Sequence, residues 1–286
     1  MKVVYDPALS CDGGRGGFRV LYPVRDGFLE YNFVHSVSAE KNCDLWRMSV
    51  VNGLDESGAF CRRLTKGGAE WEMALRLKGR PDFIGGFNHG DEVGREPVFF
   101  LDGALLFPEA LTEARDCSKL EISVESVGFD PADPSVALLS HRKHYLFDSS
   151  GVEVEQEVLW KRDVVLDGKF KSYFAMMPPL KHAPKQEEET VTHSYSFGEE
   201  KTALITRLPV EAGGVSRITV EGDSYRFTMS AADYQPRYDN GYFALLTDNG
   251  NLNYHKMYLA FAGGKEETVS AGTRWRAKTH YRIEKK

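Results

Sequence analysis

The stretch SVALLSHRKHYLFDSSGVEVEQEVLWKRD, residues 135–163, alternates apolar and polar side chains on both sides of the central segment 148–151. Alternation with a period of two is typical of a β-strand with one buried face, and the Asp, Ser and Gly of residues 148–151 favour a turn. A four-residue turn there pairs apolar side chains with apolar ones and polar with polar. The facing pairs are then Phe147 with Val152, Tyr145 with Val154, His144 with Glu155, and Arg142 with Glu157. The stretch therefore predicts a β-hairpin with one apolar and one charged face.

Similar short alternating segments fill most of the 286 residues. Residues 18–52 alternate on both sides of an Arg-Asp-Gly turn, and residues 98–106 resemble a hairpin around a second Asp-Gly pair. Residues 71–77 place Trp, Met and Leu at alternate positions, which favours another strand. Residues 106–120 are the best candidate for a helix. We therefore expect an all-β fold, a two-sheet β-sandwich or jelly-roll-like architecture with one short helical insertion.

The sequence contains no internal repeat, and its length is common for a single β-rich domain. We expect one domain over residues 1–286. The polar stretch 183–190, with three consecutive glutamates, is the one place for a soft boundary.

The composition argues against several classes of partner. The net charge is −6, and no run rich in Lys or Arg occurs, so we expect no nucleic-acid partner. No run of about 18 apolar residues is present, so we expect no membrane partner. The four cysteines form no Cys-x-x-Cys pair, which argues against structural zinc. A cytoplasmic location is expected for the sequence as it stands, or secretion if a signal peptide has been removed.

The densest group of polar side chains lies in DFIGGFNHGDEVGREPVFFLDGALL, residues 82–106. Glycines on a loop between stiff apolar segments let a substrate approach closely, and histidine can transfer protons near neutral pH. We predict His89 as a catalytic residue and Asn88, Glu92 and Arg95 as substrate-binding residues. The alternative is a surface turn with a solvated histidine.

A second candidate site lies on the hairpin. A carboxylate opposite His144 would orient its ring and favour its charged form, so we predict His144 and the neighbouring Tyr145 as catalytic residues. The alternative is a row of cross-strand ion pairs facing solvent.

A third group lies in NLNYHKMY, residues 251–258, where period-two alternation places Tyr254 and Lys256 on one face. Tyrosine rings can stack on the apolar faces of pyranose rings, so we predict Tyr254 as a catalytic acid and Lys256 as a substrate-binding residue. Arg237 and Tyr242, in the adjacent loop-rich segment, are predicted to bind substrate as well. The alternative is that the tyrosines pack inside.

Motifs for nucleotides and for α/β-hydrolases are absent, so no nucleotide cofactor is expected. The inventory of His, Tyr, Arg, Asn and Glu on a β-rich scaffold suits a carbohydrate substrate. We expect a polysaccharide lyase that cleaves a uronate-containing glycan by β-elimination. In this scheme Asn88 neutralises the uronate carboxylate, His89 removes the C5 proton, and Tyr254 or Tyr145 protonates the leaving oxygen.

Three alternatives remain open at this level. A glycoside hydrolase would need a second carboxylate within about 5–9 Å of Glu92. A non-catalytic glycan-binding or structural module would use the four tryptophans and exposed tyrosines as a platform. A cupin-like enzyme would bind a divalent metal through His89 and Glu92, joined by His141 or His144.

Overall fold

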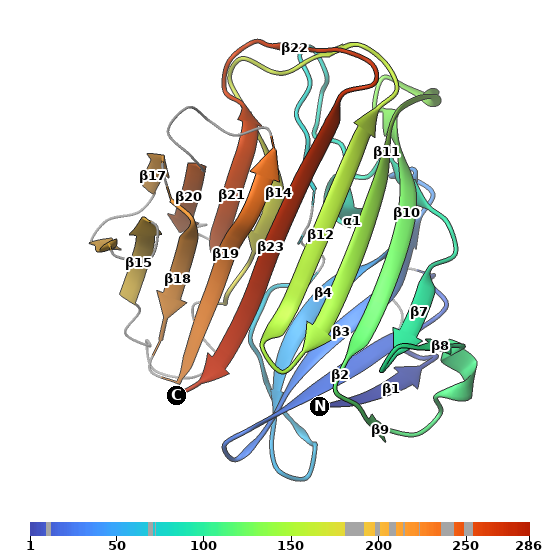
Figure 1. Ribbon diagram of the computed structural model, residues 1–286, viewed down its shortest axis with the longest axis vertical. Helices are drawn as coiled ribbons and strands as arrows, with labels where there is room; N and C mark the ends of the chain where they lie inside the picture. The colour runs from blue at the N-terminus through green and yellow to red at the C-terminus, as the bar shows by residue number, and fades with distance from the viewer. Residues whose placement is uncertain are drawn as a thin grey trace.

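The computed structural model describes the chain except for residues 10–12, 68–70, 72, 181–191, 198–200, 206–209, 214, 223, 236–242 and 249–253. Strands dominate every part of it (Figure 1). The first half contains β1 (Lys2–Asp6), β2 (Gly17–Val24), β3 (Gly27–Ser38), β4 (Cys43–Leu54), β5 (Phe60–Arg63), α1 (Gly86–His89), β6 (Glu92–Gly94), β7 (Val98–Leu101), β8 (Ala104–Leu106), the 3₁₀ turn η1 (Pro108–Ala110), β9 (Arg115–Asp116), β10 (Leu120–Asp130) and β11 (Asp133–Asp148). The second half contains β12 (Gly151–Trp160), β13 (Val164–Val165), β14 (Lys171–Met177), β15 (Thr192–Phe197), β16 (Lys201–Ile205), β17 (Val210–Gly213), β18 (Arg217–Glu221), β19 (Tyr225–Gln235), β20 (Phe243–Asp248), β21 (His255–Gly263), β22 (Thr268–Val269) and β23 (Arg274–Lys285).

The hairpin predicted from residues 135–163 is confirmed as strands β11 and β12. All four expected pairs face each other: Phe147 with Val152, Tyr145 with Val154, His144 with Glu155, and Arg142 with Glu157. The apolar members of these pairs are fully buried, whereas Arg142 and Glu155 are exposed. Burying one face and solvating the other fixes this register, because a shift by one residue would expose the whole apolar set.

The hairpin lies in the middle of a long antiparallel layer with the order β10, β11, β12, β23, β19, β18 (Figure 1). Strands β1 to β5 form the neighbouring part of the same hydrogen-bonded sheet. A separate four-stranded sheet has the order β14, β21, β20, β17.

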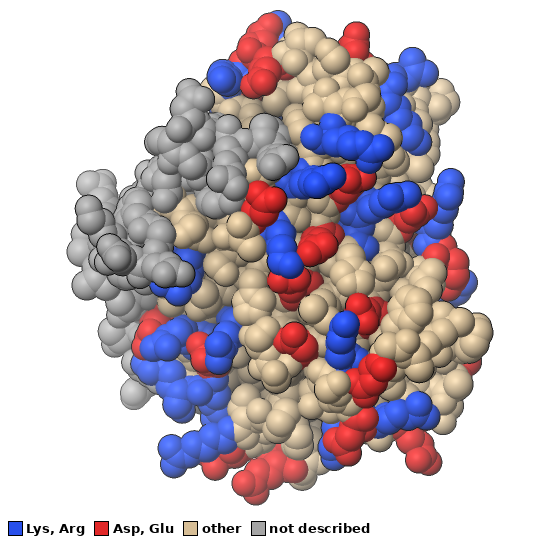
Figure 2. Space-filling model, viewed as in Figure 1, with Lys and Arg blue, Asp and Glu red and all other residues tan. Residues whose placement is uncertain are grey.

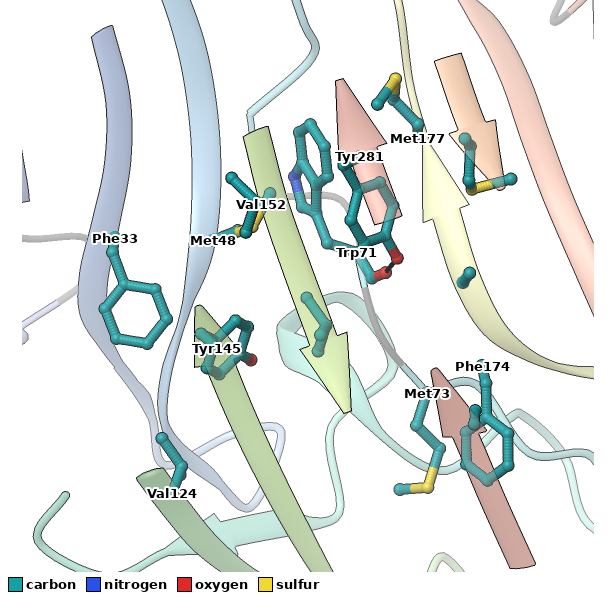
Figure 3. Packing of buried hydrophobic residues seen from close by; sticks show 14 of the residues in the cluster. Phe33, Met48, Trp71, Met73, Val124, Tyr145, Val152, Phe174, Met177 and Tyr281 are labelled. Atoms are coloured by element: carbon teal, nitrogen blue, oxygen red, sulfur yellow. Dashed lines mark hydrogen bonds between the residues drawn. The ribbon is translucent and has the colours of Figure 1, made fainter. Parts of the chain in front are cut away.

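The core lies between these layers. Tyr145 of β11 packs edge-on against Phe33 of β3, with ring centroids 4.8 Å apart, and Phe174 of β14 lies in the same cluster (Figure 3). Trp71 packs against Tyr281 of β23, and the Tyr281 hydroxyl donates to the Trp71 carbonyl (Figure 3). Aromatic side chains of this size account for much of the apolar area that stabilises the fold.

The expected all-β sandwich is confirmed. In the described part of the chain, the helical insertion expected within residues 106–120 is a single 3₁₀ turn, Pro108–Ala110. Residues 71–77 bury the expected Trp, Met and Leu side chains, but they bond to neighbouring segments through isolated bridges instead of a regular strand. The soft boundary at 183–190 lies outside the described residues. Among those described, no helix is long and apolar enough to span a membrane.

Candidate functional site

The loop that carries His89 depends on glycines at both of its ends. Gly85 and Gly90 have φ angles of 104° and 88°, which residues with a side chain rarely adopt. A Cβ atom on Gly90 would lie 2.1 Å from the Lys41 carbonyl oxygen, and one on Gly85 would lie 2.8 Å from that of Met73. The backbone between them forms the short turn α1, which places His89 at its end. The sequence Gly-Gly-Phe-Asn-His-Gly thus specifies a tight turn held close to its neighbours.

Lys41, which lies between β3 and β4, holds this turn through two hydrogen bonds. Lys41 donates from Nζ to the Asn88 carbonyl oxygen at 2.9 Å, and its own carbonyl accepts from the Asp91 amide at 2.8 Å. Gly85 and Gly90 close the turn through a backbone bond of 2.9 Å. His89 is therefore held on a well-bonded turn.

A small pocket of about 130 Å³ lies beside this turn. Its lining residues are Ala74, Phe83, His89, Tyr173, Met176, Lys256 and Tyr258. The pocket therefore brings together His89 and Lys256, two predicted site residues that are far apart in the sequence. We call this set of residues the His89 pocket.

His89 has a carboxylate partner and an aromatic neighbour. Its Nδ1 lies 3.0 Å from Asp82 Oδ1, and its ring lies 4.9 Å from the Phe83 ring. A neutral imidazole that donates from Nδ1 presents Nε2 as its proton acceptor. The His89 side chain is 20% exposed, so a ligand in the pocket can reach it.

The opposite wall is formed by the outer faces of β14 and β21. Lys256 and Tyr258 share one face of β21, as the sequence predicted, while the intervening Met257 is fully buried. Lys256 Nζ lies 5.9 Å from the Tyr258 ring, and the Tyr258 ring lies 4.5 Å from the Tyr173 ring. The guanidinium of Arg76, close to the pocket, lies 5.2 Å from the centroid of the Phe83 ring. The wall thus combines aromatic faces with cations.

The contributions of Phe83 and Tyr173 to the pocket were not predicted from the sequence. Tyr173 alternates with buried residues on β14, but only the pairing of β14 with β21 places it beside Tyr258. A hydrophobic alternation cannot tell which strand will become the neighbour, so the sequence held no sufficient signal for this residue.

Glu92 does not line the pocket. Its side chain is 1% exposed, and its oxygens accept bonds from the Gly86 amide at 3.0 Å, Ser126 Oγ at 2.5 Å and His141 Nδ1 at 2.9 Å. Burial by itself raises the pKa of Glu92, but nearby Lys143 and His141 and the hydrogen bonds from His141 and Ser126 hold it well below its usual value. Glu92 is a buried carboxylate with structural partners, so a role in direct substrate binding does not fit its position.

The remaining predicted residues are scattered. Asn88 is exposed on the turn, and Arg95 is exposed and lies 3.6 Å from Glu125. Tyr145 is fully buried in the core between the layers (Figure 3), and Tyr254 is 4% exposed beside Lys256. Arg237 and Tyr242 lie outside the described residues.

His144 lies in a different cavity, a groove of about 600 Å³ on the outer face of β10, β11, β12, β19 and β23. Its Nδ1 is 3.1 Å from Ser123 Oγ, and its Nε2 is 3.5 Å from Glu121. Glu155, which faces His144 across the hairpin, pairs instead with Lys278 of β23 at 2.8 Å. Acidic and basic side chains alternate over this face (Figure 2). The groove is larger than the His89 pocket, but many of its charges already have partners.

Metal ligands do not converge in the described part of the chain. No group of three or more His, Cys, Asp or Glu side chains there could hold a metal ion. His89 is directed to Asp82, and Glu92 is enclosed by Ser126, His141 and Lys143. The cupin-like alternative therefore lacks a ligand set among these residues.

No model of a known protein family matches the sequence, and no curated protein matches it. Similar folds occur among solved structures. A galactose mutarotase-like protein from Clostridium acetobutylicum has 10% sequence identity and a TM-score of 0.52, over 95% of this chain and 96% of that one. A galactose mutarotase-like protein from Lactobacillus casei (8% identity, TM-score 0.45, 93% and 100% covered) and a putative aldose 1-epimerase from Escherichia coli K12 (10%, 0.39, 94% and 100%) match less well. The first similarity shows a shared fold.

These similarities correct the expected reaction. The Clostridium protein whose fold this chain shares is mutarotase-like, so the assignment as a polysaccharide lyase acting on a uronate glycan is wrong, and so is the enzyme class. The geometry gives a physical reason, because the supposed acid Tyr145 lies in the core and Asn88 points to the exterior. The expected sugar ligand agrees with the name of the Clostridium protein, which is described as galactose mutarotase-like.

The hydrolase and binding-module alternatives also disagree with the structure. A hydrolase built on Glu92 would need that carboxylate to reach a glycosidic bond, but it is fully buried. The four tryptophans proposed as a glycan platform are Trp46, Trp71, Trp160 and Trp275, and all of them are at most 4% exposed.

Proposed function

We propose that this protein is an aldose 1-epimerase that interconverts the anomers of a single sugar in the His89 pocket. The observation that carries the proposal is the convergence of His89, Lys256, Tyr173 and Tyr258 in one pocket. The mutarotase-like fold supports it, because the Clostridium protein aligns over nearly the whole chain. Sugar recognition by a few polar groups on an aromatic surface is a common form of ligand pocket.

The reaction needs one proton acceptor and one proton donor on either side of the anomeric carbon. In ring opening the O1–H and C1–O5 bonds break, and a C=O bond forms at C1. Neutral His89 takes the O1 proton, and the Lys256 ammonium gives a proton to O5. Rotation about C1–C2 exposes the other face of the aldehyde, and ring closure returns both protons. The step uses no oxidant, reductant or further reactant.

Asp82 has a clear role in this scheme. A carboxylate beside Nδ1 fixes the tautomer that leaves Nε2 as the acceptor, and it stabilises the imidazolium formed after proton transfer. The Tyr173 and Tyr258 rings, tilted by 40° to each other, present aromatic surface for the apolar face of the sugar ring.

The size of the pocket favours a small substrate. A volume of about 130 Å³ is the share of roughly four water molecules in the liquid. That volume suits the reacting end of one sugar ring, whereas a polysaccharide would need an extended groove.

Polarimetry of freshly dissolved α-aldoses tests the proposal. The wild-type protein is expected to speed the approach to the anomeric equilibrium for at least one aldose in a panel of hexoses and pentoses. His89→Gln keeps a polar side chain of similar size but cannot act as a base near neutral pH, so we expect its rate to fall by about 10²–10⁴-fold.

His144→Ala provides the comparison. If this variant lost the activity and His89→Gln kept it, the reaction would belong to the large outer groove. If the wild-type protein accelerated no aldose of the panel, the epimerase proposal would be wrong.

A further inference from the structure

A chain of buried hydrogen bonds runs from the turn that carries His89, through the interior of the fold, to strand β14. Its first link is the Gly86 amide, which donates to Glu92 Oε2 at 3.0 Å. His141 Nδ1 lies 2.9 Å from Glu92 Oε1, and His141 Nε2 lies 3.1 Å from Gln156 Oε1. Gln156 Nε2 then donates to the Phe174 carbonyl oxygen at 2.6 Å. The side chains of this chain are at most 3% exposed.

Both partners of the His141 ring offer hydrogen-bond acceptors. The Gln156 amide nitrogen donates to a carbonyl, so its Oε1 is the atom that faces His141 and it can only accept. The Glu92 carboxylate can likewise only accept. His141 therefore presents both ring nitrogens to acceptors, Nδ1 to Glu92 and Nε2 to Gln156.

The two ends of the chain lie directly behind the two walls of the His89 pocket. Gly86 is the first residue of α1, and His89 is the last. Phe174 follows Tyr173, which lines the opposite wall. The pairing of β14 with β21 shifts its register on both sides of Tyr173, so Phe174 lies at an irregularity whose carbonyl turns inward to Gln156. Such irregularities re-aim side chains next to functional sites.

We propose that Glu92, His141 and Gln156 are positioning residues that hold the two walls of the His89 pocket at a fixed separation. None of them lines the pocket. In a low-dielectric interior a fully bonded chain of this kind is stiff, and loss of one link leaves a buried group without its partner. Its importance for a sugar reaction rests on the proposed function, but the mechanical link between the walls does not.

Gln156→Met tests the link, because methionine has a similar length, cannot donate to the Phe174 carbonyl and offers His141 only a weak sulfur acceptor. Tyr234→Phe is the matched control. It removes a buried bond to Thr279 Oγ1 of 2.7 Å, beside the Phe174 ring, and it lies outside the chain. Amide NMR spectra of the two folded variants are compared with the wild type at Gly86 and His89, on the far side of the core. We expect these signals to shift in Gln156→Met and to stay in place in Tyr234→Phe.

A second measurement tests the same hydrogen bonds in the wild-type protein. Nitrogen-15 NMR of the imidazole rings is expected to show hydrogen on His141 Nδ1, the nitrogen that faces the Glu92 carboxylate. A ring without hydrogen on Nδ1 would overturn the chain as described. Should Gln156→Met fail to fold, Glu92→Gln gives the reverse experiment, with the expected signal change at the Tyr173 and Phe174 amides.

The effect of Gln156→Met on the His89 pocket is measured as the change in kcat/KM for the aldose that the wild type accepts. Misplacing a reacting group by about 1 Å can lower a rate about 100-fold, so we expect kcat/KM of Gln156→Met to fall by roughly 10–100-fold. Unchanged Gly86 and His89 signals, together with unchanged kcat/KM, would overturn the proposal. If no aldose reacts, the epimerase function fails, and the NMR comparison still decides whether the walls are linked.

Discussion

Strand β11 carries ionisable side chains on both faces. Those on the outer face are exposed to solvent, whereas those on the inner face are buried. On the outer face, Arg142 pairs with Glu125 at 3.1 Å, and both side chains are at least half exposed. On the inner face, His141 and Lys143 are buried with Glu92. Exposed pairs contribute little to stability, whereas a buried charge without its partner is costly. We therefore expect the few buried ionisable groups to affect the stability of the fold more than the many exposed ion pairs do.

The largest difference between buried and exposed positions is expected in the reactivity of the thiols of Cys43 and Cys61. Cys43 is buried close to Glu92, and burial, followed by the charge of Glu92, raises its pKa to about 12. Such a thiol holds roughly a thousandth of the thiolate of an ordinary cysteine at neutral pH. Exposed Cys61 is expected to be alkylated at least about a thousandfold faster, as followed by mass spectrometry of the native protein. Equal rates would show that the buried region around Cys43 and Glu92 opens to solvent.

Removal of Glu92 should have the next largest effect. Glu92→Ala leaves Lys143 buried without its carboxylate partner, and it leaves His141 Nδ1 and the Gly86 amide without their acceptor. We expect the free energy of unfolding to fall by about 3–5 kcal/mol. Chemical denaturation measures this change, and a loss below about 1 kcal/mol would contradict the role given to the buried pair.

Glu221 is intermediate between the buried and the exposed carboxylates, because its side chain is 28% exposed. Arg226 and Lys286 donate hydrogen bonds that lower its pKa to about 2, from an ordinary value of 4.5. A carboxyl whose folded-state pKa is lowered stabilises the fold above its unfolded pKa, and this contribution disappears as the pH falls from about 4.5 toward 2. Glu221→Gln is expected to lack this part of the acid dependence. Identical slopes of unfolding free energy against pH for both proteins would contradict the assignment.

The smallest effect is expected on the outer face. Arg142→Ala breaks an exposed pair with Glu125, so the free energy of unfolding should change by less than about 1 kcal/mol, and less still in high salt. Denaturation at low and high salt checks both expectations. A loss as large as that of Glu92→Ala would remove the contrast between the faces.

Local patterns predicted much of the fold. The β11–β12 hairpin follows from period-two alternation and a short turn, both of which are contained within 29 consecutive residues. The regular strand expected at residues 71–77 did not form, because its neighbours Ile84, Leu166 and Tyr173 each meet it at single positions. Alternation predicts which side chains are buried, but the regularity of pairing depends on partners elsewhere in the chain.

Prediction of the site was limited by the same dependence on distant partners. His89 stood out because glycines and polar residues surround it, and Lys256 because it shares a strand face with tyrosines. Glu155 was expected to orient His144, but β23 places Lys278 beside it. Glu92 resembled a site residue in the sequence. In the structure it is buried, and it bonds to Ser126 of β10 and His141 of β11.

Mapping a sugar on the isotope-labelled protein by NMR tests the central claim most directly, namely that the sugar site is the His89 pocket and not the larger charged groove. The titration uses the aldose that reacts fastest in the polarimetric panel. The account predicts that signals of His89, Tyr173, Lys256 and Tyr258 shift together with one saturation curve. Shifts confined to Arg142, His144 and Lys278, with the His89 pocket unchanged, would contradict it.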